Sequence, residues 1–218
     1  MARRGDELRE HILATAKDVF LERGFERASM DVLAARAATS KRTLYAHFES
    51  KDKLFLAVVH FVRELYLDRL KTPDDYSEDT VEAVVLFCGR FLQLLRWRPA
   101  LRTCRLGITE ADRLPEASAQ YYDAIFTTSH ERLAAFLSER CQLSPSTSTG
   151  IAHELLGRTV YPQFVRALFG VDEPLNEWPD EASIADDLDL APIRRAVAAL
   201  LPAAEVGKTW STRPPTSH

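Results

Sequence analysis

Three serines within the first fifty residues constrain the fold of this chain more than any other feature. Ser29, Ser40 and Ser50 each stand directly before a segment with apolar residues at helical spacing. Serine is a preferred N-cap residue, because its side-chain oxygen accepts a hydrogen bond from a free backbone N–H of the first helical turn. The three serines therefore predict helix starts, and the helices that follow are expected over residues 30–37, 41–47 and 51–70.

A longer helix is expected before the first serine, over residues 6–23. Its apolar residues recur at helical spacing on one face, and they are Leu8, Ile12, Ala16, Val19 and Phe20. Gly24 is expected to end this helix in a left-handed conformation, with Phe25 folded back onto Phe20. Two short helices that are joined by a tight turn, here residues 38–40, and packed on a longer helix form a helix-turn-helix. The second short helix of such a motif can lie in the major groove of DNA.

The placement of cations in this segment favours contact with DNA. Lys41 and Arg42 lie in the first turn of the second short helix, and Lys51 and Lys53 in the first turn of the long one. Cations there oppose the helix macrodipole, at a cost of roughly several tenths of a kcal/mol each. Nearby phosphates would reverse that balance, and Arg42 could instead reach a guanine edge. The alternative, an ordinary solvated face, is less favoured because the pattern repeats at two helix starts.

The same segment closely resembles the TetR family of bacterial regulators. The resemblance rests on Gly24-Phe25, on Ser-Met-Asp-Val-Leu-Ala at residues 29–34, on Ser-Lys-Arg-Thr-Leu-Tyr-Ala-His-Phe at residues 40–48, and on Ser-Lys-Asp-Lys-Leu at residues 50–54. At the turn, Ala38 and Thr39 replace the usual Gly and Val, and Leu33 stands where Ile is usual. Ala38 fits such a turn only with a tolerable φ or with some strain. The expected DNA-contacting residues are Ser29, Ser40, Lys41, Arg42, Thr43, Tyr45, His47 and Lys51.

The resemblance implies a ligand-responsive transcriptional regulator. A member of this family has a helix-turn-helix domain and a helical C-terminal domain that dimerises and binds a small effector. The chain is thus expected to be a repressor that binds a pseudo-palindromic operator as a homodimer and is released by a small molecule. A transcriptional activator remains an alternative, as does a helical protein-interaction module that has lost DNA binding.

The rest of the chain is also expected to be helical, giving an all-α protein of about nine helices. Further helices are expected over residues 78–96, 100–112, 116–141, 149–169 (bent near Pro162) and 192–201, with an acidic loop over residues 172–189. The predicted domains are residues 6–66 for DNA binding and residues 67–204 for effector binding and dimerisation, followed by a disordered tail over residues 205–218. Residues 102–112 and 114–116 are loosely similar to one C-terminal subfamily associated with efflux and quorum-sensing regulation.

Two sets of apolar residues are candidates for the functions of the C-terminal domain. Aromatic side chains typical of an apolar pocket are Phe87, Phe91, Trp97, Tyr121, Tyr122 and Phe126. By the resemblance, the last two long helices form the dimer interface, with Leu155, Leu156, Val160, Phe164, Ile193, Val197, Leu200 and Leu201 as candidates. For both sets the alternative is that the side chains belong to the core of one subunit.

Charge and cysteine content exclude several other classes of protein. The net charge is −4, yet residues 1–53 carry eleven Lys and Arg against nine Asp and Glu, so the N-terminal part is the one suited to phosphates. Three cysteines give no disulfide framework, although Cys104 between two arginines could have a lowered thiol pKa. No signal-peptide or membrane-spanning segment is expected, and no metal-ligand cluster, catalytic set or cofactor. The protein is therefore expected to be cytoplasmic and not an enzyme.

Overall fold

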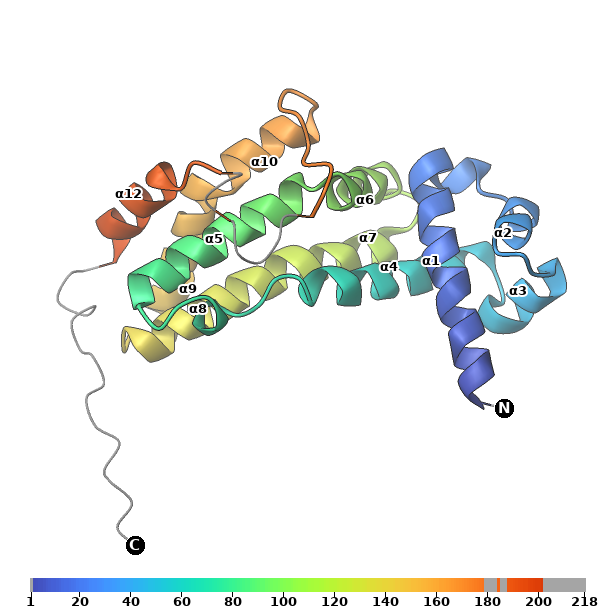
Figure 1. Cartoon of the computed structure of the whole chain (residues 1–218), viewed down its shortest axis with the longest axis horizontal. Helices are drawn as coiled ribbons and strands as arrows, with labels where there is room; N and C mark the ends of the chain where they lie inside the picture. The colour runs from blue at the N-terminus through green and yellow to red at the C-terminus, as the bar shows by residue number, and fades with distance from the viewer. Residues whose placement is uncertain (1, 179–183, 185–187, 202–218) are drawn as a thin grey trace, which may run out of the picture.

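The computed structural model describes residues 2–178, 184 and 188–201, without the side chains of residues 2–4 and 67. Within these residues the fold is helical, apart from one isolated parallel bridge between Trp97 and Leu175. Figure 1 shows an elongated molecule, with the first three helices at one end and a helical bundle at the other. The predicted all-α class is therefore confirmed. The tail over residues 205–218 lies outside the described residues.

The N-terminal end consists of α1 (Ala2–Arg27), α2 (Met30–Arg36), α3 (Lys41–Phe48) and the start of α4 (Lys51–Leu67). Gly24 interrupts α1 with a φ of 73° and a ψ of 170°, a conformation that glycine adopts without a Cβ clash. The chain then turns so that the Phe25 ring stacks on Phe20 with their centroids 5.8 Å apart. The Phe55 ring from α4 is T-shaped to both rings, with centroids 5.1 and 5.2 Å away. The predicted return of Phe25 onto Phe20 is confirmed, and it fixes α4 against α1.

The bundle contains the remaining helices. They are a 3-10 turn η1 (Pro73–Asp75), α5 (Thr80–Arg96), α6 (Arg98–Thr109), α7 (Pro115–Tyr122), a π-helical turn η2 (Asp123–Thr127), α8 (Thr128–Arg140), α9 (Pro145–Thr159), α10 (Tyr161–Leu168) and α12 (Ala191–Leu200). Each of the nine predicted helices occurs within the described residues, and two of them are divided. The predicted helix over residues 116–141 is α7, η2 and α8, because one wide turn interrupts the regular hydrogen bonding.

The second division separates α9 from α10 at Val160, which has a φ of −103° and a ψ of −55°. Pro162 explains the break, since it has no N–H to donate and its ring clashes with the carbonyl four residues before it. The prediction of a bend at this proline is confirmed. The expected start at residue 149 is wrong, because Ser144 caps the helix through Thr147 N and Pro145 occupies its first turn, where the fixed φ of proline suits a helix.

The core of the bundle surrounds α5, which lies among the other helices (Figure 1). Every residue from Ala83 to Leu95 is buried except Leu86, which is partly buried. A helix that is buried on all sides must be covered on all sides, and η1, α6, α8, α9, α10 and α12 provide that cover. A Cβ on Gly89 would lie 2.9 Å from Leu190, so this glycine allows the segment before α12 to pack closely on α5.

Candidate DNA-binding surface and ligand cavity

The three predicted N-caps all form. Ser29 Oγ accepts a hydrogen bond from Val32 N at 3.3 Å, and Ser40 Oγ accepts one from Thr43 N at 3.0 Å. Ser50 Oγ accepts from Lys53 N at 3.1 Å. Each bond satisfies a backbone donor that the first helical turn leaves free. These local bonds explain why short helices start where the sequence predicts them.

One face of α3 anchors the helix and the other faces solvent. Leu44 is fully buried and Phe48 nearly so, and the guanidinium of Arg9 lies over the Phe48 ring at 5.0 Å. On the opposite face Arg42 is exposed, and Tyr45 exposes 44% of its surface. Arg42 forms no hydrogen bond or ion pair with the described residues. The helix therefore presents a long cation and a phenol to solvent.

The other predicted contact residues on α3 already have partners within the chain. Lys41 Nζ is 3.0 Å from Asp31 Oδ2 of α2, and this carboxylate raises the pKa of the Lys41 ammonium. The Thr43 hydroxyl lies 2.8 Å from the Ser40 hydroxyl, and His47 is half-buried beside Phe48. A phosphate near Lys41 would compete with Asp31 for the ammonium, whereas Arg42 can reach DNA without breaking an internal contact.

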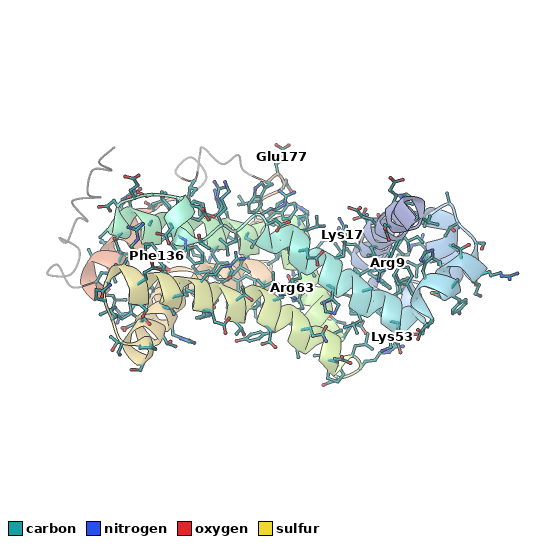
Figure 2. All side chains as sticks on the ribbon, turned by 90° about the horizontal axis from the view of Figure 1, so that it is seen from below. Arg9, Lys17, Lys53, Arg63, Phe136 and Glu177 are labelled. Atoms are coloured by element: carbon teal, nitrogen blue, oxygen red, sulfur yellow. The ribbon has the colours of Figure 1, made fainter. Side chains whose placement is uncertain are left out.

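The cation pattern predicts that Lys51 contacts DNA, but its ammonium lies against Phe25. Its Nζ donates to the backbone oxygen of Phe25 at 3.0 Å and lies 4.2 Å from the centroid of the Phe25 ring. The ammonium therefore neutralises the carbonyl end of α1, where a helix carries partial negative charge. Lys53, by contrast, is exposed. Figure 2 shows Lys53 and Arg9 at the helix-turn-helix end of the molecule, far from Phe136 in the bundle.

The turn between α2 and α3 contains the departure at Ala38, whose φ is 47°. Thr39 N donates to Ala34 O at 3.0 Å, so the turn closes the C-terminal end of α2 with its hydrogen bonding intact. A left-handed conformation costs a residue with a Cβ roughly 1–2 kcal/mol. The chain therefore keeps the backbone path of a glycine turn and accepts strain at an alanine.

A cavity of about 1020 Å³ lies in the bundle, and its lining residues come from α6, α7, η2, α8, α9 and α10. Tyr121, Tyr122 and Phe126, which the sequence predicts as pocket residues, line it. Phe87 and Phe91 do not line it, because α5 places them fully inside the core. Trp97 also lies away from it, packed edge to face on Tyr66 and Trp178.

Sequence reasoning missed a polar cluster in the lining of this cavity, formed by His130, His153 and Tyr161. The histidines are 23 residues apart in the chain, and they meet because α8 and α9 pack side by side. Their imidazole centroids lie 4.4 Å apart. Scattered positions in a sequence give no signal of such a pair before the helix packing is known.

The predicted dimer residues are covered within one chain. Leu155, Leu156, Val160, Ile193, Val197 and Leu201 each expose 5% or less of their surface. Phe164 exposes 7% and lines the cavity, and Leu200 is only partly buried. Most of these side chains are therefore already covered without a partner subunit, which favours the core alternative for them, while the interface itself stays a prediction. These residues lie on the inward faces of α9, α10 and α12. There they pack on α5 and on one another.

Comparison with known families decides what this arrangement belongs to. Residues 12–58 match the family described as bacterial regulatory proteins of the tetR family, and residues 82–191 match the AefR-like transcriptional repressor C-terminal domain. The chain belongs to the TetR family. It is therefore a DNA-binding transcriptional regulator of a non-enzymatic family, with a helix-turn-helix before a helical C-terminal domain.

Individual relatives of this TetR-family chain have different roles. Over 54 residues it is 50% identical to the HTH-type transcriptional activator FasR of Mycolicibacterium smegmatis, covering a quarter of each chain. It is 28% identical over 167 residues to the nucleoid occlusion factor SlmA of Vibrio vulnificus, covering 74% of this chain and 85% of that one.

Solved structures share the fold of this TetR-family chain over most of its length. One is a TetR-family regulator from Mesorhizobium loti, with a TM-score of 0.73 and 22% identity, covering 91% of this chain and 96% of that one. Another is described as the flavonoid-responsive regulator FrrA, with a TM-score of 0.68 and 24% identity, covering 91% and 99%.

The described part of the chain was also compared with three other features: a membrane span, a metal site and a reactive cysteine. None of its helices is long and apolar enough to cross a membrane. None of its groups of three or more His, Cys, Asp or Glu could hold a metal ion. The three cysteines are buried and none forms a disulfide, and burial raises the pKa of the Cys88 thiol to about 12 and that of Cys104 to about 11. A lowered thiol pKa at Cys104 is therefore wrong, because desolvation outweighs the charge of Arg105.

Proposed function

We propose that this TetR-family regulator is a repressor that binds a pseudo-palindromic operator as a homodimer and leaves it when a small molecule fills the cavity. The observation that carries this proposal is the pairing of an exposed recognition helix, α3, with a largely apolar cavity in the same chain. The cavity volume is close to the upper end of the range typical of small-molecule sites, roughly 300–1,000 Å³. The description of the matching C-terminal family as a repressor domain supports the direction of regulation.

A contact route between the cavity and α3 supports the release step. Residues of α7 and η2 that line the cavity belong to the elements that pack on α4. The hydroxyl of Tyr66 in α4 lies 3.2 Å from that of Thr103 in α6. Between α6 and α7, Arg113 forms an ion pair with Glu26 and lies over the Phe25 ring at 4.4 Å. A ligand that moves α6 or α7 would therefore move α4 and the end of α1, and with them α3.

The dimer of this proposal uses outward-facing side chains, since the inward ones are already covered. Phe169 exposes 81% of its surface, Val171 62% and Val165 46%. Val165 and Phe169 lie four residues apart at the end of α10, so they share one helix face. An exposed apolar face of this kind is typical of an interface between subunits. We therefore infer that two copies meet through the end of α10.

Selection of bound DNA from a random pool tests the DNA-binding step. A pseudo-palindrome should emerge, with half-sites about one turn of DNA apart, roughly 34–36 Å, or a small multiple. Affinity should fall steeply with salt, because Lys and Arg contacts release counterions from phosphates. If no palindrome emerges, the proposed dimeric operator complex is contradicted.

The same operator, placed at a promoter, distinguishes repression from activation. Transcription in vitro should fall when the protein is added and recover with an effector. The similarity to the activator FasR favours the second candidate, a transcriptional activator, but it covers only the DNA-binding part. A rise in transcription on adding the protein would establish that second candidate instead.

A further inference from the structure

Three polar side chains that line the cavity, the exposed His153 among them, define the kind of group a ligand must offer. His130 of α8, His153 of α9 and Tyr161 of α10 all line the cavity. The Tyr161 hydroxyl is 3.1 Å from His130 Nε2, and the two imidazoles lie beside each other. Three successive helices thus bring their hydrogen-bonding groups to one place.

Backbone carbonyls set the tautomer of both histidines. His130 Nδ1 is 2.7 Å from Phe126 O, and His153 Nδ1 is 2.8 Å from Thr149 O. A carbonyl oxygen only accepts hydrogen bonds, so each Nδ1 carries the hydrogen and each Nε2 is left as an acceptor in the neutral ring. Tyr161 donates to His130 Nε2. His153 Nε2 has no hydrogen-bond partner within the described residues, so it is an open acceptor for a ligand's donor.

The charge of the lining disfavours an anionic ligand. The lining contains no Lys or Arg, and its one carboxylate is Glu131. Burial lowers the pKa of His130, and the neighbouring His153 adds to this effect. The His130 imidazole is therefore disfavoured as a cation at neutral pH. A carboxylate or phosphate in the cavity would lose its hydration and meet no fixed cation, whereas a neutral hydroxyl finds an acceptor.

Aromatic rings cover the neighbouring part of the wall. Tyr122 and Phe126 stack with centroids 5.2 Å apart and planes 28° from parallel. Phe164 lies against Phe126 at 5.7 Å. The stacked rings of Tyr122 and Phe126 are called the aromatic shelf below. Tyr122 is 58% exposed, so the chain leaves one face of this shelf uncovered. Such a shelf suits a flat aromatic ligand, because stacked rings gain attraction beyond the burial of area.

We propose that the cavity binds an uncharged, hydroxylated, planar aromatic molecule, with a hydroxyl donating to His153 Nε2 and a ring stacked on the aromatic shelf. This inference rests on the proposed function for its role in regulation. Ligand binding can be measured without DNA, so the proposed ligand class and the proposed function can fail separately.

Calorimetric titration of the full chain with three matched stilbenes tests the ligand class. Resveratrol offers phenol donors, its trimethyl ether keeps the rings without donors, and stilbene-4,4′-dicarboxylate replaces the donors with anions. Resveratrol should bind, and the ether should bind about tenfold more weakly, the worth of roughly one hydrogen bond. The dicarboxylate should bind weakest of the three. Equal binding of resveratrol and ether, tighter binding of the dicarboxylate, or no binding of resveratrol would each overturn the proposal.

Variants test the two contacts. His153→Ala should weaken resveratrol about tenfold and leave the ether unchanged, because only resveratrol uses the acceptor. Tyr122→Ala should weaken both ligands by a similar factor, roughly two- to tenfold, through the lost ring contact. His11→Ala, an exposed histidine on α1, is the matched control and should change neither. An unchanged resveratrol affinity in His153→Ala would refute the proposed hydrogen bond.

Release of operator DNA is measured separately with the same protein. If resveratrol binds as described and the operator complex persists, the ligand class stands and the release step of the proposed function fails. If another compound releases the operator and resveratrol does not bind, the proposed function stands and the ligand class fails.

Discussion

The helix-turn-helix end and the cavity end of this molecule are built by different means. At the first, Ser29, Ser40 and Ser50 each bond to a backbone N–H three residues later. At the second, His130, His153 and Tyr161 meet from three different helices. The DNA-binding surface is thus specified by contacts that are short in sequence, and the cavity by contacts that are long. Changes at the two ends should differ accordingly in what they disturb.

The largest expected effect is at Phe25, where the two ends are joined. Phe25 is fully buried and packs on Phe20 and Phe55, with Lys51 and Arg113 over its ring. Phe25→Ala should lower the free energy of unfolding by about 3–5 kcal/mol, because it leaves a cavity. Urea denaturation measures this loss. The exposed Ile108→Ala is the control and should change the free energy of unfolding by less than about 0.5 kcal/mol.

Phe169 tests whether the bundle end carries the dimer. Phe169→Glu places a charge in the proposed interface and should weaken dimerisation by about 2 kcal/mol or more, the scale of an interface hot spot. Sedimentation velocity at micromolar concentration should then show a monomer. Phe169→Leu keeps the apolar character and should stay dimeric. A dimeric Phe169→Glu protein would place the interface elsewhere.

Arg42 tests the base-reading role of the helix-turn-helix end. Arg42→Ala should cost about 1–3 kcal/mol on the selected operator and less on random duplex, because a guanine contact distinguishes sequences. Lys53→Ala is the comparison, and it should weaken both duplexes alike while lowering the salt slope by about 1. Fluorescence anisotropy titrations over a range of salt give both quantities. Equal losses from both variants on both duplexes would show that Arg42 contacts only phosphate.

Ala38 tests the strain at the turn before α3. Ala38→Gly should raise the free energy of unfolding by up to about 1 kcal/mol, because relief of the positive φ exceeds the entropy that glycine loses on folding. Ala46→Gly inside α3 is the matched control and should lower the free energy of unfolding by about 1 kcal/mol. Thermal unfolding of both variants measures whether the free energy of unfolding rises in one and falls in the other. A loss of stability in Ala38→Gly would contradict the strained turn.

The smallest expected effect is a pH dependence at the cavity end. Burial lowers the pKa of His130 below its ordinary 6.5, so the unfolded chain takes up the proton first as pH falls. The free energy of unfolding should therefore be unaffected above about pH 6.5 and decrease as the pH falls below it. His153 of α9 and Tyr161 of α10 face the same imidazole, and Glu131 of α8 lines the same cavity. His130→Gln should flatten this decrease in urea titrations at pH 7.5 and 5.5, and His11→Gln should not.

Much of the helix-turn-helix could be predicted because its signals act within a few residues. A cap bonds to the third residue after it, and glycine at residue 24 takes its positive φ whatever surrounds it. Lys51 is the exception at this end. Its place in the sequence predicts a phosphate contact, while its actual neighbours, the carbonyl and ring of Phe25, come from a residue 26 positions earlier.

The bundle was predicted as a set of helices but not as a set of sites. Phe87 and Phe126 are both aromatic residues on helices, yet one is fully buried in the core and the other lines the cavity. Leu155 and Val197 are interface candidates by the family resemblance, and both are fully buried within one chain. Periodicity shows that a helix has an apolar face, and it does not show what covers that face.

The sequence by itself determined the fold class, the helix-turn-helix and its exposed Arg42 and Tyr45, because hydrogen bonds within a few residues decide them. Only the tertiary structure decided the interior position of α5, the cavity between α6 and α10, and the meeting of His130 with His153. The physical reason is that a cavity is the space left over when helices pack. Its lining therefore depends on crossing angles and side-chain volumes of the whole bundle, which no single segment contains.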